Sequence, residues 1–77
     1  MYTISRVNTN VYSVHTADGA QVGNLKRIGA LWKFKAVGYD ADGGVEPGGG
    51  PLTHLHNTVL SAPDVAELNA KLGAGAA

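Results

Sequence analysis

The sequence predicts an α+β fold: a small antiparallel β-meander of three to four strands, covered on one face by a single C-terminal helix. The first forty residues are rich in β-branched and aromatic residues and are divided by short turn motifs, which is typical of strands. Residues 62–72 instead show the apolar spacing of one amphipathic helix. Because the strands come first and the helix last, this order indicates the α+β class.

The first two strands are expected over residues 2–7 and 11–16, with a break at residues 8–10. The second strand runs into Asp18-Gly19, a dipeptide that favours a two-residue hairpin with a type I′ turn. Pairing outward from this turn gives three opposed pairs, namely Thr16 with Gln21, Val14 with Gly23, and Tyr12 with Leu25. Both faces of this hairpin carry apolar residues, so the hairpin alone does not identify the buried face.

The strand that completes this hairpin, QVGNLKR at residues 21–27, is joined by a turn at Ile28-Gly29-Ala30 to the next strand. That strand, residues 29–40, has a clear alternation of polarity. Trp32, Phe34, Ala36 and Gly38 share one face, and Lys33, Lys35, Val37 and Tyr39 share the other. Such a pattern predicts a half-buried antiparallel strand whose Trp and Phe enter the core while its lysines face water.

A Gly/Pro-rich loop is expected at residues 41–51, where the chain crosses from the sheet to the helix side. Residues 52–60 then alternate in polarity. A short fourth strand and an extended lead-in to the helix explain this segment equally well.

The C-terminal helix is expected over residues 62–72. Ser61 is a favourable N-cap with Asp64 three residues later, and Gly73 suits the left-handed position after the last turn, before a frayed tail at 73–77. The predicted core consists of Trp32, Phe34, Ala36, Val65, Leu68 and Leu72, joined by Ile4, Val22 or Leu25, Leu55 and Val59.

Length and composition indicate one small domain spanning residues 1–77. The chain is 44% hydrophobic and 16% charged, which is ordinary for a globular protein. It has no cysteine, which excludes disulfides and thiolate-bound zinc. No apolar run approaches a membrane span, and the first ten residues do not resemble a signal peptide. We therefore expect a cytoplasmic protein without membrane contact.

The main functional hypothesis is a non-enzymatic interaction module. A sheet covered on one side leaves an open face, expected to carry Val37 and Tyr39 and also Tyr12 with Val14, together with open strand edges. These features favour self-association or binding of a protein partner. The sequence contains no nucleophile motif, no catalytic residue is assigned, and no cofactor is expected.

Charge distribution supports an alternative, nucleic-acid binding. Residues 1–36 carry five cations and one carboxylate, whereas residues 37–77 carry one cation and five carboxylates. The basic segment 26–35 supplies Lys26, Arg27, Lys33 and Lys35, a pattern able to follow a phosphate backbone. Trp32 alternates with the lysines, so it stacks on a base only if its face is uncovered.

A second alternative lies at the Gly-rich loop and the histidines that follow it. The backbone amides of Gly48, Gly49 and Gly50 are candidates for an anion-binding nest, although Pro51 and the missing lysine exclude a Walker A loop. His54 and His56 fall on one face if the segment is extended, as a metal pair would need. A third ligand would have to come from His15, Asp40, Asp42 or Glu46.

Overall fold

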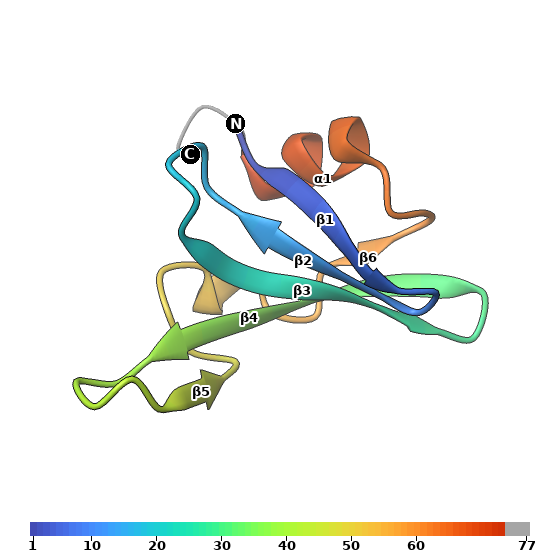
Figure 1. Ribbon diagram of the computed structural model, residues 1–77. Helices are drawn as coiled ribbons and strands as arrows, with labels where there is room; N and C mark the ends of the chain where they lie inside the picture. Colours follow the sequence, from blue (N-terminus) through green and yellow to red (C-terminus); the bar gives the residue numbers. More distant parts are fainter. Residues whose placement is uncertain (74–77) are drawn as a thin grey trace.

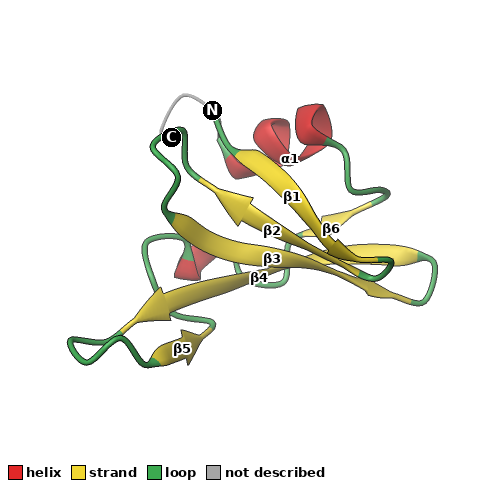
Figure 2. Ribbon diagram, viewed as in Figure 1, coloured by secondary structure: helices red, strands yellow, loops and turns green. Residues whose placement is uncertain are grey.

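The computed structural model, which describes residues 1–73, confirms the α+β fold: an antiparallel β-meander with one C-terminal α-helix (Figures 1 and 2). In chain order the elements are β1 (Thr3–Asn8), β2 (Val11–His15), β3 (Gln21–Ile28), β4 (Leu31–Tyr39), β5 (Val45–Pro47), the 3₁₀ helix η1 (Thr53–Leu55), β6 (Val59–Leu60) and α1 (Val65–Leu72). The described sheet has six strands rather than three or four, because the predicted loop 41–51 contains β5 and the segment 52–60 contains η1 and β6.

Strands β1 to β4 follow one another across the sheet, and the far edge of β4 is shared between two short strands. Strand β5 pairs with the C-terminal part of β4, from Val37 to Tyr39. Strand β6 pairs with the N-terminal part, at Trp32 and Lys33. In Figure 1 the β4–β5 hairpin extends away from α1 at the opposite end of the molecule.

Two of the three predicted pairs of the first hairpin are confirmed, since Tyr12 lies opposite Leu25 and Val14 opposite Gly23, whereas the pair of Thr16 with Gln21 is wrong. The predicted type I′ turn is wrong, because Gly19 has a positive φ and Asp18 does not. The Gly19 amide donates to the Thr16 carbonyl oxygen at 3.0 Å, and a register shift follows directly. The extra residue therefore pairs His15, instead of Thr16, with Gln21.

The core lies between one face of the sheet, called the covered face, and the layer formed by α1 and residues 52–60. Phe34 and Leu25 are fully buried there, and Trp32, at 9% exposure, packs edge-on against the Tyr12 ring at a centroid distance of 5.5 Å. Among the predicted core residues, burial is confirmed for Trp32, Phe34, Ala36, Leu68, Leu72, Val22 and Leu25. Ile4 and Leu55 pack on the core in partly buried positions. Val65 and Val59 are each 39% exposed, so their prediction as core was wrong.

Helix α1 begins three residues later than predicted, which explains the exposure of Val65. Its N-cap is Asp64, whose carboxylate accepts the amides of Ala66 and Glu67 at 2.7 and 3.3 Å. Ser61 is therefore not the cap; its amide and hydroxyl both donate to the Glu67 carboxylate, at 2.9 and 2.7 Å. The helix ends at Gly73 in the left-handed conformation, as predicted. The predicted frayed tail beyond Gly73 lies outside the described residues.

The side chain of Asn69 ties α1 to the start of the chain. It accepts the Tyr2 amide at 2.7 Å and donates to the Tyr2 carbonyl at 3.0 Å. Asn69 and Tyr2 are 5% and 3% exposed, so these bonds are shielded from water. This clamp holds the helix against the β1 side of the sheet and leaves the other face open.

Candidate functional site

The strand register sorts the basic residues of segment 26–35 onto two faces. Lys26 lies directly opposite Lys33, and Lys35 lies opposite Asn24, all on the face away from α1, called the open face. Arg27 lies opposite the core residue Trp32, which places it on the covered side. The structure thus brings together three of the four predicted nucleic-acid contacts and separates Arg27 from them. Because Trp32 is buried, it is not available for base stacking.

The three lysines of the open face have no carboxylate partner among residues 1–73. The ion pair found in this part of the chain joins Lys71 to Glu67 on α1, at 3.3 Å. Lys35 donates a hydrogen bond to the Asn57 side chain, a neutral partner. Like charges directly opposite each other on neighbouring strands are destabilising, so the pairing of Lys26 with Lys33 weakens the fold.

Beside the lysines, the open face is hollowed. This lysine hollow has a volume of about 240 Å³ and lies between the central strands and the β4–β5 hairpin. Its lining combines polar and apolar side chains, contributed by Asn24, Lys26, Lys35, Val37, Val45, Pro47 and His56 together with backbone at Ala36 and Gly48. Val37, predicted on the exposed face, does face this side but is only 8% exposed.

His56 is held by the edge of β4. Strand β5 pairs with β4 from Val37 onward and β6 pairs with it up to Lys33, so Ala36 lies between the two paired segments. The Ala36 amide donates to Nδ1 of His56 at 3.0 Å. Since Nδ1 accepts, the ring proton resides on Nε2, which is a donor. The side chain therefore completes the backbone ladder with one nitrogen and offers the other to the hollow.

The structure does not bring His54 and His56 together as the extended segment predicted. His54 lies in η1 and lines a hollow on the covered side with Tyr2, Leu52 and Leu72, whereas His56 lines the lysine hollow. No cluster of three or more His, Asp or Glu side chains able to hold a metal occurs in the described part of the chain. The premise of the metal hypothesis, an extended strand at 54–56, is wrong because the chain forms a 3₁₀ turn there.

The glycine loop has a structural role at Gly48, Gly49 and Gly50. The Gly48 amide donates to the Ala36 carbonyl at 2.7 Å and the Gly49 amide to the Glu46 carbonyl at 3.0 Å, so neither points outward as a nest requires. A Cβ on Gly50, whose φ is +84°, would lie 2.4 Å from the Val37 carbonyl oxygen. The glycines thus allow the loop to cross the backbone of β4 in direct contact.

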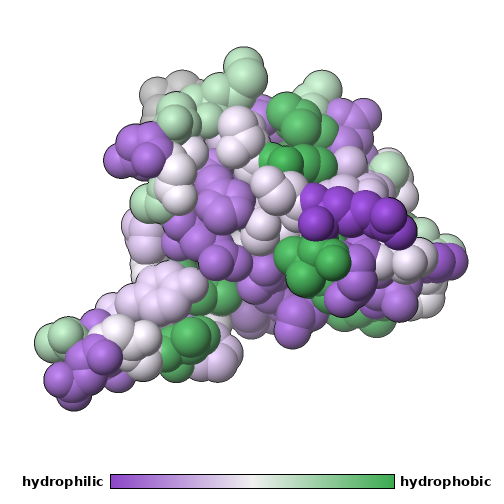
Figure 3. All heavy atoms as spheres, in the orientation of Figure 1, coloured by the Kyte–Doolittle hydropathy of each residue, from purple (hydrophilic) through white to green (hydrophobic). Residues whose placement is uncertain are grey.

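The open face is less apolar than predicted, because Tyr12 and Val14 lie on the covered face and belong to the core or pack against it. Ile28 and Leu31, each 47% exposed, end the β3–β4 hairpin, and the Tyr39 hydroxyl donates to the Gln21 amide oxygen at 3.3 Å. Figure 3 shows a surface that is mostly hydrophilic or neutral, with small and separate hydrophobic areas.

Ser13 and His15 form a further polar pair on β2, with Ser13 Oγ 2.8 Å from His15 Nε2. The other ring nitrogen of His15 lies 3.3 Å from the Gly19 carbonyl oxygen. A hydrolytic dyad also needs a substrate cavity and oxyanion donors beside the nucleophile. Neither residue lines the hollows described in this section, and Ser13 is buried, so the pair is a contact within β2 that also joins His15 to the β2–β3 turn.

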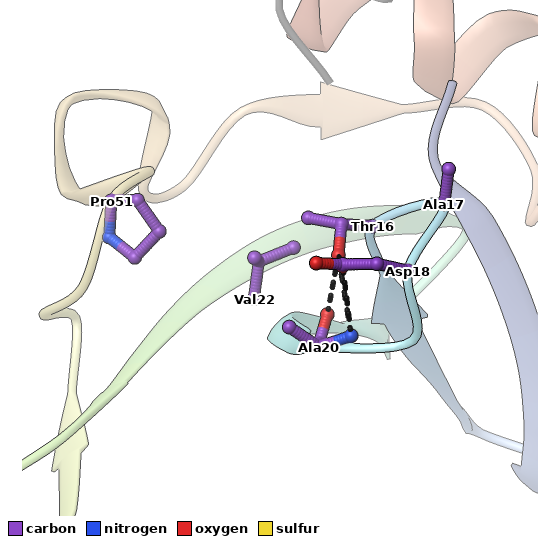
Figure 4. Close-up of a pocket in the computed structure, with 6 residues that line it drawn as sticks. All are labelled: Thr16, Ala17, Asp18, Ala20, Val22 and Pro51. Carbon is purple, nitrogen blue, oxygen red and sulfur yellow. Dashed lines mark hydrogen bonds between the residues drawn. The ribbon is translucent and has the colours of Figure 1, made fainter.

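A third hollow, of about 400 Å³, lies between the β2–β3 turn and Pro51 (Figure 4). Its polar groups are already paired with each other. The Thr16 hydroxyl donates to the Asp18 carboxylate, and the Ala20 amide adds a second bond, which together lower the pKa of Asp18. This hollow therefore offers little polar recognition.

Sequence reasoning missed the contributions of Asn24, His56 Nε2 and Asn57 to the open face. Asn57 carries a positive φ of 73°, a conformation in which Asn is enriched, but nothing in the sequence connects it to Lys35. Comparison of the chain with family models, with curated proteins and with solved structures gave no match. In the described part of the chain, no helix has the length and apolar character needed to cross a membrane.

Proposed function

We propose that this protein is an intracellular, non-enzymatic binding module that holds single-stranded nucleic acid on the open face of its sheet. The observation that supports this most directly is the Lys26–Lys33 pair, two cations placed opposite each other on neighbouring strands and forming no ion pair with a carboxylate of residues 1–73. An arrangement that costs stability is expected where a ligand supplies the missing negative charge.

The rest of the open face suits a flexible strand. Lys35 follows Lys33 on the same face of β4, about 7 Å further along, so the cations form a short track. Tyr39 continues that face and is half-exposed, which offers one ring for stacking. With three cations and one ring, the surface matches a few nucleotides of a single strand.

Among residues 1–73, the carboxylates form no ion pair with these lysines. Asp18 belongs to the β2–β3 turn, Asp40 and Asp42 to the β4–β5 turn just beyond Tyr39, Glu46 to β5 opposite Gly38, and Asp64 and Glu67 to the start of α1. A net charge of zero therefore coexists with a locally positive face. The isoelectric point of about 6.8 reflects only the total charge, so it does not reveal a face on which cations are concentrated.

The test is fluorescence anisotropy with a labelled oligothymidylate of about 12 nucleotides, measured over a range of salt. Three phosphate contacts predict a slope of log K against log[salt] of roughly −2, since each contact contributes about −0.7 on a single strand. Lys26→Gln, Lys33→Gln and Lys35→Gln should each reduce the slope by about 0.7.

Arg27→Gln is the matched control, because Arg27 is an exposed cation next to Lys26 in sequence but on the covered side of the sheet. It should leave binding almost unchanged. Binding that is absent, that ignores salt, or that falls as much in Arg27→Gln as in Lys26→Gln would contradict the proposal.

Self-association is the second candidate, supported by the pairing pattern of β1. Within the described sheet β1 pairs only with β2, so its six residues present one unpaired edge. A second copy adding its own β1 would extend the sheet across this edge. Sedimentation velocity over a wide concentration range should then show a dimer, which Val7→Pro should abolish; a concentration-independent monomer would exclude this candidate.

A further inference from the structure

We infer that the lysine hollow binds a phosphate monoester carried on a small apolar or aromatic body, such as a nucleotide. This inference rests on the proposed function, because Lys26 and Lys35 belong both to the lysine hollow and to the nucleic-acid track. It adds a defined pocket to that surface and names the chemical group that the pocket recognises.

The polar groups facing the lysine hollow are hydrogen-bond donors. Lys26 and Lys35 present ammonium groups, and His56 presents Nε2–H because its Nδ1 accepts the Ala36 amide. The Asn24 side-chain oxygen accepts a hydrogen bond from the side-chain NH₂ group of Gln21 at 3.1 Å. The NH₂ group of Asn24 is thereby left for the hollow. Among residues 1–73, no carboxylate lines the hollow. A ligand that fits must therefore be rich in acceptors and negatively charged.

The charge of the hollow favours phosphate over carboxylate. The planar fork of arginine matches either group, whereas lysine acts as a point charge and is a common phosphate binder. The hollow has two lysines and no arginine. A phosphate monoester carries a charge of about −1.5 to −2 at neutral pH and three acceptor oxygens. Two ammonium groups balance that charge, and donors from separate strands can reach different oxygens.

The opposite wall explains the body of the ligand. The apolar side of the lysine hollow consists of Val37 on β4 and Val45 and Pro47 on β5. The hollow has a volume of about 240 Å³. This volume is below the roughly 300–1,000 Å³ of common ligand pockets. The hollow is therefore too small for several nucleotides, and a free nucleotide and the 5′-terminal nucleotide of a strand are the two sources of the same phosphate chemistry.

The lysine hollow is also preorganised. Lys35 is held by the Asn57 side chain, and the His56 ring is fixed by the β4 backbone. The loop that supplies His56 is closed by the hydrogen bond from the Thr53 hydroxyl to the Gly48 carbonyl. Donors that are fixed before binding lose little conformational entropy when a ligand arrives.

The experiment is a series of ¹⁵N chemical-shift titrations of the full chain with adenosine 5′-monophosphate, adenosine and benzoate. The nucleotide should shift the amides of Val45 and Gly48 and the ring signals of His56, while adenosine and benzoate should bind at least roughly tenfold more weakly. Equal affinity for adenosine would show that the phosphate is not recognised, and equal affinity for benzoate would show a general anion site; either result overturns the inference.

Two exposed valines supply a matched pair of variants. Val45→Glu places a carboxylate at the rim of the lysine hollow and should weaken nucleotide binding by roughly tenfold or more. Val7→Glu makes the same change on β1, away from the lysine hollow, and should have little effect. Val45 and Val7 are about equally exposed, at 59% and 60%, so both variants should fold. Equal effects of the two variants would count against the site.

A pair of oligothymidylates, with and without a 5′-phosphate, separates the two proposals. The phosphorylated strand should bind more tightly, and Val45→Glu should remove that difference. Salt-dependent binding without any preference for the 5′-phosphate, and with no nucleotide binding, would reject the pocket and retain the track. Nucleotide binding at the lysine hollow without binding of either strand would reject nucleic-acid binding and retain the pocket.

Discussion

Replacing Asn69 with alanine should destabilise the protein by about 2–6 kcal/mol. The substitution removes both hydrogen bonds to the Tyr2 backbone, at 2.7 and 3.0 Å. Tyr2 is only 3% exposed, so its amide and carbonyl would be left without partners in a buried position. Each such group costs about 1–3 kcal/mol, which gives the stated range. The Val65 carbonyl, the second acceptor of the Asn69 NH₂ group, keeps the ordinary helical bond and adds little.

The assay is urea denaturation followed by the fluorescence of Trp32, which is the only tryptophan and is buried. With an m value of about 1 kcal/mol per molar urea, the midpoint should fall by about 2 M or more. Such a loss is a large share of the roughly 5–15 kcal/mol by which domains are stable, so thermal unfolding should also occur at a much lower temperature.

Asn10→Ala is the control, because it removes the same atoms from an exposed turn. Only the backbone amide of Asn10, and not its side chain, forms a hydrogen bond to Asn8. It should change the stability by no more than about 0.5 kcal/mol. A loss below about 0.5 kcal/mol for Asn69→Ala would refute the reasoning, since it would mean that the Tyr2 backbone is satisfied equally well without the clamp.

Two further predictions concern the loop and the helix start. Gly50→Ala should destabilise the protein far more than Gly43→Ala. Both residues have a positive φ, but a Cβ at Gly50 would lie 2.4 Å from the Val37 carbonyl oxygen, whereas a Cβ at Gly43 would have no atom within 4 Å. Equal urea midpoints of the two variants would contradict this prediction. The backbone amide and then the hydroxyl of Ser61 lower the pKa of Glu67. The resulting stability is present above the ordinary glutamate pKa and is lost as pH falls through the lower folded-state pKa. Glu67→Gln should therefore flatten the pH dependence of unfolding below about pH 4.5, and an unchanged pH profile would exclude this role.

Local patterns were sufficient to predict most of the meander. The alternation of residues 32–36 identifies which side chains enter the core, because side chains in a strand point to opposite faces with a period of two. The order of apolar residues and Gly73 likewise identified the helix and its end. The start of the helix was misplaced because Ser61 and Asp64 are both good N-caps. They are distinguished by the structure, in which Asp64 accepts the first helical amides and Ser61 instead donates to Glu67.

Segment 45–47 could not be recognised as a strand from sequence, and for residues 52–60, which contain β6, a short strand was only one of two equally good interpretations. Each of these two strands is very short, and its extended form depends on pairing with β4 rather than on its own composition. The close approach of Gly38 and Gly50 lets the chain reach that edge, and it joins residues that are far apart in sequence. A composition rich in glycine indicates a loop, but it does not tell which backbone the loop touches.

The sequence by itself determined the two-faced meander, the terminal helix and the presence of cations opposite the core face, because these follow from periodicity and from turn and cap residues. Only the tertiary structure decided that Lys26 faces Lys33 while Arg27 faces away, since this depends on the register of two strands. It also decided that His56 turns toward the lysines and His54 away from them. The lysine hollow exists because β5 and residue 56 meet along β4, a long-range pairing that no local pattern encodes.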